Sequence, residues 1–461
     1  MKKLISIIIV LAMFASTAYA AIAGDVDNDG SVTVSDALAA LRIAARLDPY
    51  NAAADVDGDR SVTVADALQL LRCSVGFITP NGLSGNTDIE VKVTSRAASY
   101  GVTQAMVDRG MTNIGDTARL VRVMRKAAAG EEITVGFIGG SITVGGMATT
   151  ENARYARVVE AWWKRTFPNA KINYVNAGYS GTPSLFGVHR MQEDLMQYEP
   201  DFVMIEFGVN DNLQDWQKEA YASLVRRVLT AKWEPAVMLF FLTNNDGSNA
   251  QSDQQPIGEF YDLPMVSQRD AIWPEVKPPY GTGSTFTWEE IVADYVHPTD
   301  KGHAICGELI NCLLQAVYDN LDKLSSECKP VREDVPLPYA YEHTEWLNHR
   351  NTTPIQYGGF AKYTNDNFSW RATGGNGDPM IIRYYGKRVS IAIKQSESSS
   401  IKATCSVDDR APVWIDNDTL LISAGQYAYF QLVDDAEPGW HTMYISSFSG
   451  SMTILGFFVS W

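Results

Sequence analysis

The sequence carries short polar blocks whose residue types suit nucleophilic catalysis. Ser141 follows a Gly-Gly pair, and His297 stands three residues after Asp294 in the stretch DYVHP. A serine hydroxyl is a poor nucleophile at neutral pH unless a neighbouring base takes its proton. A histidine can be that base, and a carboxylate can fix its tautomer and stabilise the imidazolium that forms. These residues therefore predict acyl transfer with Ser141 as nucleophile, His297 as base and Asp294 as the partner of the base.

Acyl transfer also needs donors for the negative charge that develops on the carbonyl oxygen. The backbone N–H groups of Ser141 and Gly181 and the side-chain amide of Asn210 are the candidates, because each follows a short apolar stretch. Loss of one such donor typically lowers the rate by about 10²–10³. We therefore expect these three residues to form an oxyanion hole.

Apolar stretches that alternate with helix-like ones must position these blocks. The predicted strands begin at Ile133, Ile172, Phe202 and Val237, and the predicted helices cover about 116–128, 154–165 and 301–320. Strands that alternate with helices form a parallel sheet covered on both faces. Ligands of such sheets bind at the carboxyl ends of the strands. We therefore expect one sheet edge to carry Ser141, Gly181 and Asn210.

The ordered blocks resemble those of the SGNH (GDSL-type) hydrolases over roughly residues 115–320. The matching residues are Ser141, Gly181, Asn210 and His297, with Asp294 in the D-x-x-H-P element. The resemblance implies a three-layer α/β fold with a flavodoxin-like parallel sheet, and a serine esterase that needs no cofactor for catalysis. The family's first block usually reads G-D-S, whereas Gly140 replaces the aspartate here. That aspartate is not a triad member, so the substitution leaves the catalytic prediction intact.

The amino-terminal region contains one acidic twelve-residue motif twice. DVDNDGSVTVSD begins at Asp25, and DVDGDRSVTVAD begins thirty residues later at Asp55. Carboxylates at positions 1, 3, 5 and 12, with a backbone carbonyl at position 7, suit calcium, which takes six or more oxygen ligands. The predicted ligands are Asp25, Asp27, Asp29, Ser31 and Asp36 in the first loop, and Asp55, Asp57, Asp59, Ser61 and Asp66 in the second.

The paired motif resembles a type I dockerin over residues 24–77, because position 12 is Asp rather than Glu and no helix precedes either loop. The resemblance implies a small α-helical module with two structural calcium ions and a cohesin module of a cellulosome scaffoldin as its partner. It also implies cohesin contacts at the two similar helix starts, through Val34, Ser35, Val64 and Ala65. Since these starts are nearly alike, we hypothesise that either helix can lead, with the module rotated by a half-turn.

One departure concerns the second loop. Arg60 occupies the sixth position, where the turn favours a left-handed glycine. A residue with a side chain costs about 1–2 kcal/mol in that conformation. We therefore expect the second loop to bind calcium more weakly than the first.

The first twenty residues have the features of a targeting segment. Two lysines, a short apolar run and Ala18-Tyr19-Ala20 predict a secretory signal peptide, and the run is too short to span a bilayer. We therefore expect an extracellular, cellulosome-associated protein. The predicted segments are a signal peptide (1–20), the dockerin (21–78), a Gly/Asn/Thr/Ser-rich linker (79–98), the hydrolase domain (99–335) and a β-sandwich (336–461).

The last segment has short alternating strands between turn residues, which predict a β-sandwich. It resembles jelly rolls that are fused to some carbohydrate esterases. Two interpretations remain open. The domain either binds polysaccharide through exposed aromatic residues such as Trp370 or Trp414, or packs on the hydrolase and shapes its rim.

Other side chains have weaker signals. Loop and helix positions make Tyr179, Arg154, Trp273 and Trp288 candidates for lining the site, and His303 is expected to be structural. Five cysteines are too few for a disulfide framework, and a Cys328–Cys405 bond remains open.

The formal net charge of −16, from 38 basic and 54 acidic side chains, argues against nucleic acid or an anionic membrane as the partner. A dockerin implies a plant cell-wall substrate, and the hydrolase resemblance implies a small acyl group. We therefore expect deacetylation of a wall polysaccharide, with xylan as the first choice. The alternatives are an esterase for acetylated mannan, pectin or a feruloyl group, or a polysaccharide-binding protein without catalysis.

Overall fold

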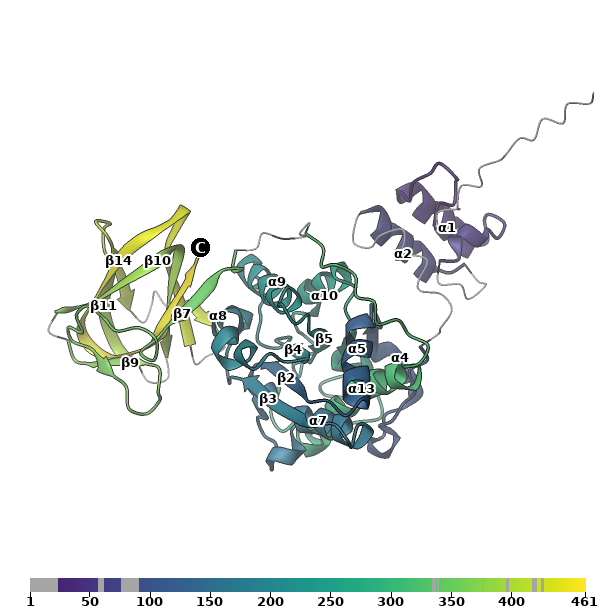
Figure 1. Cartoon of the computed structure of the whole chain (residues 1–461), viewed down its shortest axis with the longest axis horizontal. Coiled ribbons are helices and arrows are strands. Elements are labelled where there is room, and N and C mark those ends of the chain that lie inside the picture. Colours follow the sequence, from purple (N-terminus) through teal and green to yellow (C-terminus); the bar gives the residue numbers. More distant parts are fainter. Residues whose placement is uncertain are drawn as a thin grey trace, which may run out of the picture. The chain divides into compact units, whose positions relative to one another are not determined.

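The computed structural model describes residues 24–56, 62–75, 91–333, 337, 340–375, 377–394, 398–416, 421–423 and 427–461. It divides into two compact units, Met1–Glu90 and Val91–Trp461 (Figure 1). The predicted signal peptide, most of the predicted linker and the second-loop residues Asp57, Asp59, Arg60 and Ser61 lie outside the described residues. None of the described helices combines the length and the apolar character that a membrane crossing requires.

The first unit is built from two similar helices, α1 (Val34–Ala44) and α2 (Val64–Ser74), with a short 3₁₀ turn η1 (Ala52–Ala54) between them. Each helix begins with a capping box, in which the side chain of Thr33 or Thr63 and an aspartate three residues later satisfy the first turn. Ala40 and Leu70 are fully buried in the small core that the helices share. The repeat in the sequence is therefore a repeat in structure.

The hydrolase part of the second unit contains a six-stranded sheet. Its strands are β1 (Met111–Asn113), β2 (Ile133–Gly139), β3 (Ile172–Gly178), β4 (Phe202–Glu206), β5 (Ala236–Phe241) and β6 (Met265–Ser267). Their order is β1-β6-β5-β4-β2-β3, and all pairs are parallel except β1 with β6. The five parallel strands follow the flavodoxin-like order 2-1-3-4-5. The structure thus shows the mixed α/β architecture that the sequence predicts, with one antiparallel edge strand added.

Helices cover both faces of this sheet. The longer ones are α5 (Ala118–Ala128), α7 (Tyr155–Thr166), α8 (Ser184–Asp194), α9 (Asp215–Leu229), α10 (Gln251–Phe260) and α13 (Asp300–Asp319). The shorter ones are α4 (Gln104–Gly110), α6 (Ser141–Val144), α11 (Gln268–Ile272) and α12 (Trp288–Ile291). Residues of α8, α9 and α10 share one core with β4 and β5, whereas Tyr155 of α7 packs on Phe137 and Phe240 of the sheet from the other side. Three layers result.

The end of the predicted linker belongs to the second unit. Val93 and Ala97 are buried, and the Ser95 hydroxyl donates to the carbonyl oxygen of Val102 at 2.9 Å. Residues 91–98 are therefore packed chain rather than linker, because their alternate apolar side chains find a surface that composition does not reveal.

The carboxyl-terminal part is an antiparallel sheet of eight strands, which confirms the predicted all-β character. The strands are β7 (Thr344–Leu347), β8 (Ala361–Lys362), β9 (Trp370–Thr373), β10 (Pro379–Lys394), β11 (Ser399–Val407), β12 (Val413–Asp416), β13 (Leu421–Ser423) and β14 (Tyr427–Ser460). The long strands β10 and β14 pair over several stretches, and β14 also pairs with β7, β9, β11 and β13. A jelly-roll topology stays a prediction.

This sheet has its own core and also packs directly on α8. Trp370 is fully buried in the sheet core, so it is not one of the exposed aromatic residues that polysaccharide binding would require. Strand alternation places it inward, opposite Ile454 of β14. The ring of His189 on α8 stacks on Phe458 with centroids 4.5 Å apart, and Phe186 meets Trp346 edge to face. The two parts therefore form one unit.

Candidate active site

The predicted triad residues form one chain of hydrogen bonds. Ser141 is the first residue of α6, directly after β2, and His297 lies in the loop before α13. The His297 Nε2 atom lies 2.8 Å from Ser141 Oγ, and its Nδ1 atom lies 2.7 Å from Asp294 Oδ2. The structure thus brings together groups that are 156 residues apart in sequence. A serine, an imidazole and a carboxylate in this order can activate the serine oxygen.

Backbone and indole N–H groups hold Asp294 in place. Partial burial opposes its ionisation, but donation from the N–H groups of His297 and Val296, and from the imidazole, lowers the pKa of the carboxyl below its usual value. The buried Trp288 donates its indole N–H to the Asp294 carbonyl oxygen at 2.7 Å. Asp294 is therefore held ionised and oriented toward His297.

One cavity of about 580 Å³ opens over these residues. It is lined by Ser141, Gly146, Met147, Ser180, Gly181, Val209, Asn210, Asn244, Asp294, Tyr295, Val296 and His297. All the residues that the sequence predicts for the triad and the oxyanion hole lie on this one surface. They reach it because β2, β3 and β4 are parallel neighbours whose carboxyl ends share an edge.

Gly140 has a steric role beside Asn210. A Cβ atom at position 140 would lie 1.9 Å from Asn210 Oδ1, so only glycine lets the amide lie against the backbone before Ser141. The Asn210 Oδ1 atom is buried and has no hydrogen-bond partner among the described residues. This close approach requires glycine at position 140 as long as the Asn210 side chain keeps its position.

Asp211 is a buried residue beside the site, and no motif in the sequence predicts its role. Its Oδ1 accepts from the Ser184 N–H at 2.8 Å, and its Oδ2 accepts from the Gln254 amide at 2.9 Å. Burial raises the pKa of the Asp211 carboxyl to about 7. Its position next to Asn210 in an Asn-Asp pair is the only sequence signal that points to it.

His303 holds the loop after Ser141 against the imidazole of His297. Its Nδ1 accepts from the Tyr155 N–H at 3.3 Å, which leaves Nε2 to donate to the Gly146 carbonyl oxygen at 3.0 Å. Burial lowers the pKa of His303, so the ring is held neutral. A Cβ at Gly146 would lie 2.8 Å from His297 Cδ2, so this loop packs closely on the imidazole. His303 thus has the structural position that the sequence predicts.

The four predicted lining residues are placed elsewhere. Tyr179, Arg154, Trp273 and Trp288 are not among the cavity-lining residues of the described chain. The rim carries Tyr295 and Met147 instead, whose exposed fractions are 63% and 55%. Nothing in the local sequence around Tyr295 or Met147 distinguishes a rim residue from any other loop residue, so the sequence does not predict them.

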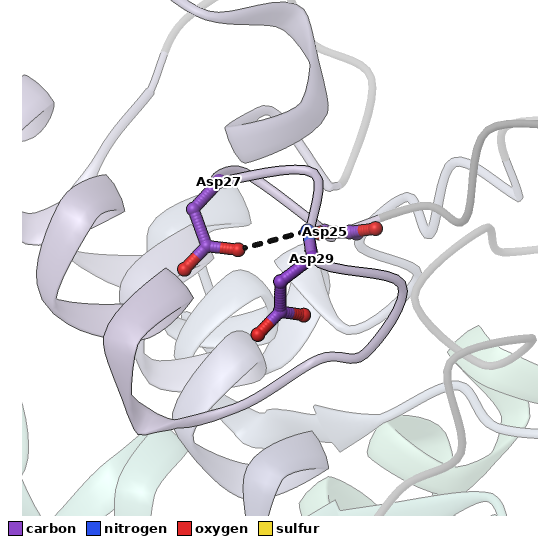
Figure 2. Close-up of side chains that lie close together, drawn as sticks. All are labelled: Asp25, Asp27 and Asp29. Atoms are coloured by element: carbon purple, nitrogen blue, oxygen red, sulfur yellow. Dashed lines mark hydrogen bonds between the residues drawn. The ribbon is translucent and has the colours of Figure 1, made fainter.

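The first acidic loop gathers carboxylates as predicted. One oxygen from each of Asp25, Asp27 and Asp29 lies within 4.8 Å of the others (Figure 2). Burial and the neighbouring carboxylates Asp36, Asp29 and Asp25 raise the pKa of Asp27. Gly30, at the sixth position, has a left-handed φ of 90° that turns the loop. A divalent cation would neutralise this concentration of charge, so the donors fit calcium.

The other predicted ligands are only partly placed by the structure. Asp36 and Asp66 are fully buried and accept bonds from loop N–H groups, such as that of Val26 onto Asp36 at 2.7 Å and that of Val56 onto Asp66 at 3.0 Å. In the second loop, Asp55 Oδ1 is buried without a hydrogen-bond partner among the described residues.

The predicted cohesin contacts are all exposed. Val34 and Ser35 begin α1, Val64 and Ala65 begin α2, and the exposed fractions of the two valines are 57% and 66%. The apolar surface continues along each helix through Leu38 and Leu41 on α1, and Leu68 and Leu71 on α2. Their helical spacing does not reveal whether such an apolar stripe faces a core or solvent, so the sequence does not identify these leucines as exposed.

Comparison with known proteins supports the description of both the hydrolase part and the amino-terminal module. Residues 137–305 match the GDSL-like lipase/acylhydrolase family, and residues 23–72 match the type I dockerin domain. A crystal structure of a two-domain esterase active on acetylated mannans is 30% identical, with a TM-score of 0.68 over 77% of this chain and 98% of that one. The same esterase co-crystallized with mannopentaose gives a TM-score of 0.66 over 97% of its chain, at 30% identity and 77% of this chain.

A curated relative is more distant. Thioesterase 1/protease 1/lysophospholipase L1 of Escherichia coli (strain K12) is 28% identical over 155 residues, which are 32% of this chain and 71% of the relative. By contrast, the similarity to the two-domain esterase covers 77% of this chain, which is longer than the hydrolase part alone.

Proposed function

Because the chain belongs to the GDSL-like lipase/acylhydrolase family and carries a type I dockerin domain, we propose that it is a secreted serine esterase that removes acetyl groups from plant cell-wall polysaccharide. The hydrogen-bonded chain from Ser141 through His297 to Asp294 carries the catalytic part of this proposal. It opens on one cavity together with the candidate oxyanion donors.

In the proposed reaction, Ser141 Oγ attacks the ester carbonyl and His297 Nε2 takes the hydroxyl proton. The Ser141 and Gly181 N–H groups and the Asn210 amide stabilise the oxyanion. The imidazolium then gives its proton to the departing sugar oxygen, and an acetyl-serine remains. Water, deprotonated by the same imidazole, attacks the acetyl group and releases acetate while Ser141 regains its proton. These groups supply each step without a cofactor.

Two hemicelluloses compete as substrate. The association of a dockerin with an esterase favours acetylated xylan. The two-domain esterase that is similar over 77% of this chain acts on acetylated mannans. That similarity includes the carboxyl-terminal part, so we favour acetylated mannan and keep acetylated xylan as the second candidate.

The amino-terminal module is proposed to dock the enzyme on a cohesin of a scaffoldin, outside the cell. The two acidic loops would each hold one calcium ion. Asp25, Asp27 and Asp29, whose carboxylate oxygens lie close together, are proposed ligands in the first loop. The exposed apolar stripes that start at Val34 and Val64 would contact the cohesin.

Acetate release tests the proposed activity. We expect the full chain to release acetate from acetylated mannan faster than from acetylated xylan or pectin, and the Ser141→Ala variant to release none. Ser99→Ala, an exposed serine without a histidine partner, is the matched control and should keep full activity. Hydrolysis by Ser141→Ala at the parent rate would refute the catalytic assignment. A faster rate on xylan would reverse the order of the two substrates.

A further inference from the structure

Five large aromatic side chains are exposed on the carboxyl-terminal sheet. Their exposed fractions are 63% for Trp440, 56% for Trp414, 46% for Phe448, 42% for Tyr385 and 36% for Tyr444. Tryptophan and phenylalanine at such exposure leave much apolar area in contact with water, which soluble domains seldom do at one place without a function.

Strand alternation and register place these five side chains on one face. On β14, Trp440, Tyr444 and Phe448 alternate with the buried Met443 and Ile445, so all three point away from the core. Tyr385 of β10 is the register partner of Trp440. Trp414 of β12 pairs with Thr404 of β11, and Thr404 pairs with Ser446 of β14, so Trp414 points the same way.

Ring contacts order this aromatic face at its two ends. The Tyr385 and Trp440 rings meet edge to face with centroids 5.6 Å apart, and the Arg383 guanidinium lies 4.8 Å from the Trp440 ring. At the other end, the Trp414 and Phe448 rings lie 5.8 Å apart. Rings that are held before a ligand arrives lose less conformational freedom on binding.

The aromatic face is separate from the contact with the hydrolase part. That contact runs through other residues of the sheet, such as Trp346 and Phe458, which pack on Phe186 of α8. It is also separate from the cavity over Ser141, which is lined only by residues between 141 and 297. A ligand on the aromatic face would therefore bind without occupying the catalytic site.

We propose that the aromatic face binds an extended polysaccharide chain. Trp440, Tyr444 and Phe448 follow one strand at every fourth position and span about 26 Å. Protein interfaces concentrate their aromatic anchors near one centre, whereas these rings form a track across a sheet. Sugar rings offer C–H faces that stack on aromatic rings and hydroxyls that bond to polar groups. Polar groups lie between the rings, namely Thr404, Ser406, Thr442, Ser446 and Arg383.

The choice of polysaccharide over a protein partner rests in part on the proposed function, because an esterase of wall polysaccharide meets such chains. The face is distinct from the active site, so binding and hydrolysis can be measured separately. The aromatic face would keep the enzyme bound to the polysaccharide while the active site hydrolyses successive ester groups.

Affinity electrophoresis of the full chain through gels with deacetylated glucomannan or deacetylated xylan tests the proposal. The Ser141→Ala background removes hydrolysis from this measurement. We expect Trp440→Ala and Trp414→Ala each to weaken retention by about tenfold, and the double variant to migrate as in a gel without polysaccharide. Trp440→Phe should keep most of the retention. Tyr198→Ala, an aromatic residue 53% exposed in the hydrolase part, is the matched control.

Two further measurements separate the outcomes. Thermal unfolding should show unchanged midpoints, because the substituted side chains are exposed, and hydrolysis of a small acetyl ester should be unchanged when Ser141 is restored. Equal retention of the double and parent chains, or no retention of the parent, overturns the proposal even if acetate release is normal. The oligomeric state of both chains is the last check. A dimeric parent chain together with a monomeric double variant would also overturn the proposal, since the face would then bind a second copy.

Discussion

Asp211 accepts the Ser184 N–H at 2.8 Å, and this bond joins the loop that carries Asn210 to the start of α8, three residues after Gly181. Two of the candidate oxyanion donors thus lie on segments that one buried carboxyl holds together. The Asp211 side chain does not line the cavity, so it acts by position rather than by contact with the substrate.

Substitution of Asp211 should change both activity and pH dependence. Asp211→Ala leaves the Ser184 N–H unsatisfied, at a cost of about 1–3 kcal/mol in the free energy of unfolding, and should lower kcat because the donors lose their fixed spacing. In the parent chain the folded-state pKa, about 7, lies above the usual 3.8. The folded state therefore binds more protons than the unfolded state between these values, and stability falls as the pH rises from about 4 to 7.

Asp211→Asn removes this titration but keeps an oxygen for the Ser184 N–H. Denaturant unfolding at pH 4, 5, 6 and 7 should show a smaller fall in stability for Asp211→Asn than for the parent chain. The difference between the two curves mainly reports Asp211. Glu206 titrates in both chains, because burial raises the pKa of its carboxyl to about 8, and the Asp211 charge adds to that rise in the parent chain. Parallel curves would contradict the burial of an ionisable Asp211.

Asp294→Asn should lower kcat by up to about 10⁴, with little change in the unfolding midpoint. The amide can still bond to His297 Nδ1, but it favours the wrong imidazole tautomer and cannot stabilise the imidazolium. Hydrolysis of a small acetyl ester measures the effect, and Asp322→Asn, an exposed aspartate on the surface, is the control. A loss of less than tenfold would mean that Asp294 does not act through His297.

Gly140→Ala should lower kcat by about 10²–10³ and change KM little. The added methyl would lie 1.9 Å from Asn210 Oδ1, so the amide must move and an oxyanion donor is lost. Gly439→Ala is the matched control, because the nearest atom to a Cβ there is 3.6 Å away. Steady-state kinetics of both variants settle the point, and an unaffected kcat in Gly140→Ala would show that Asn210 is not a donor.

Chelation should separate docking from catalysis. With EDTA we expect cohesin binding to disappear and to return when calcium is added, because the clustered carboxylates of Asp25, Asp27 and Asp29 repel one another without a cation. Ester hydrolysis by the same sample should stay constant. Calorimetry with a cohesin module and an acetate assay in parallel make the measurement. A parallel loss of hydrolysis would link the metal to the catalytic unit.

Single substitutions on the two helix starts should be tolerated. Val34→Asp and Val64→Asp should each leave cohesin affinity within about tenfold, because the other helix can lead, whereas the double variant should lose binding altogether. Their similar exposure, 57% and 66%, makes the two valines a matched pair. Complete loss from either single variant would show that the module binds in one orientation.

Patterns confined to a few neighbouring residues were enough to predict much of this protein. The D-x-x-H-P element, the acidic twelve-residue loops and the apolar stretches at 133–138 and 202–207 each predict their own local geometry. Strand alternation with helices then places Ser141, Gly181 and Asn210 on one edge, since parallel strands end together. The flavodoxin-like sheet, which the resemblance to the SGNH hydrolases implies, agrees with the order of the five parallel strands.

Contacts between distant segments had to come from the tertiary structure. Asp211 with Ser184, His303 with Gly146 and Trp288 with Asp294 each depend on where a loop meets a helix or another loop, which no local periodicity specifies. Trp370 and Trp414 are both tryptophans beside turns in the sequence, yet one is fully buried and the other is 56% exposed. Whether a strand residue is buried depends on what packs against its face of the sheet. Only the tertiary structure therefore distinguishes a core tryptophan from a surface one.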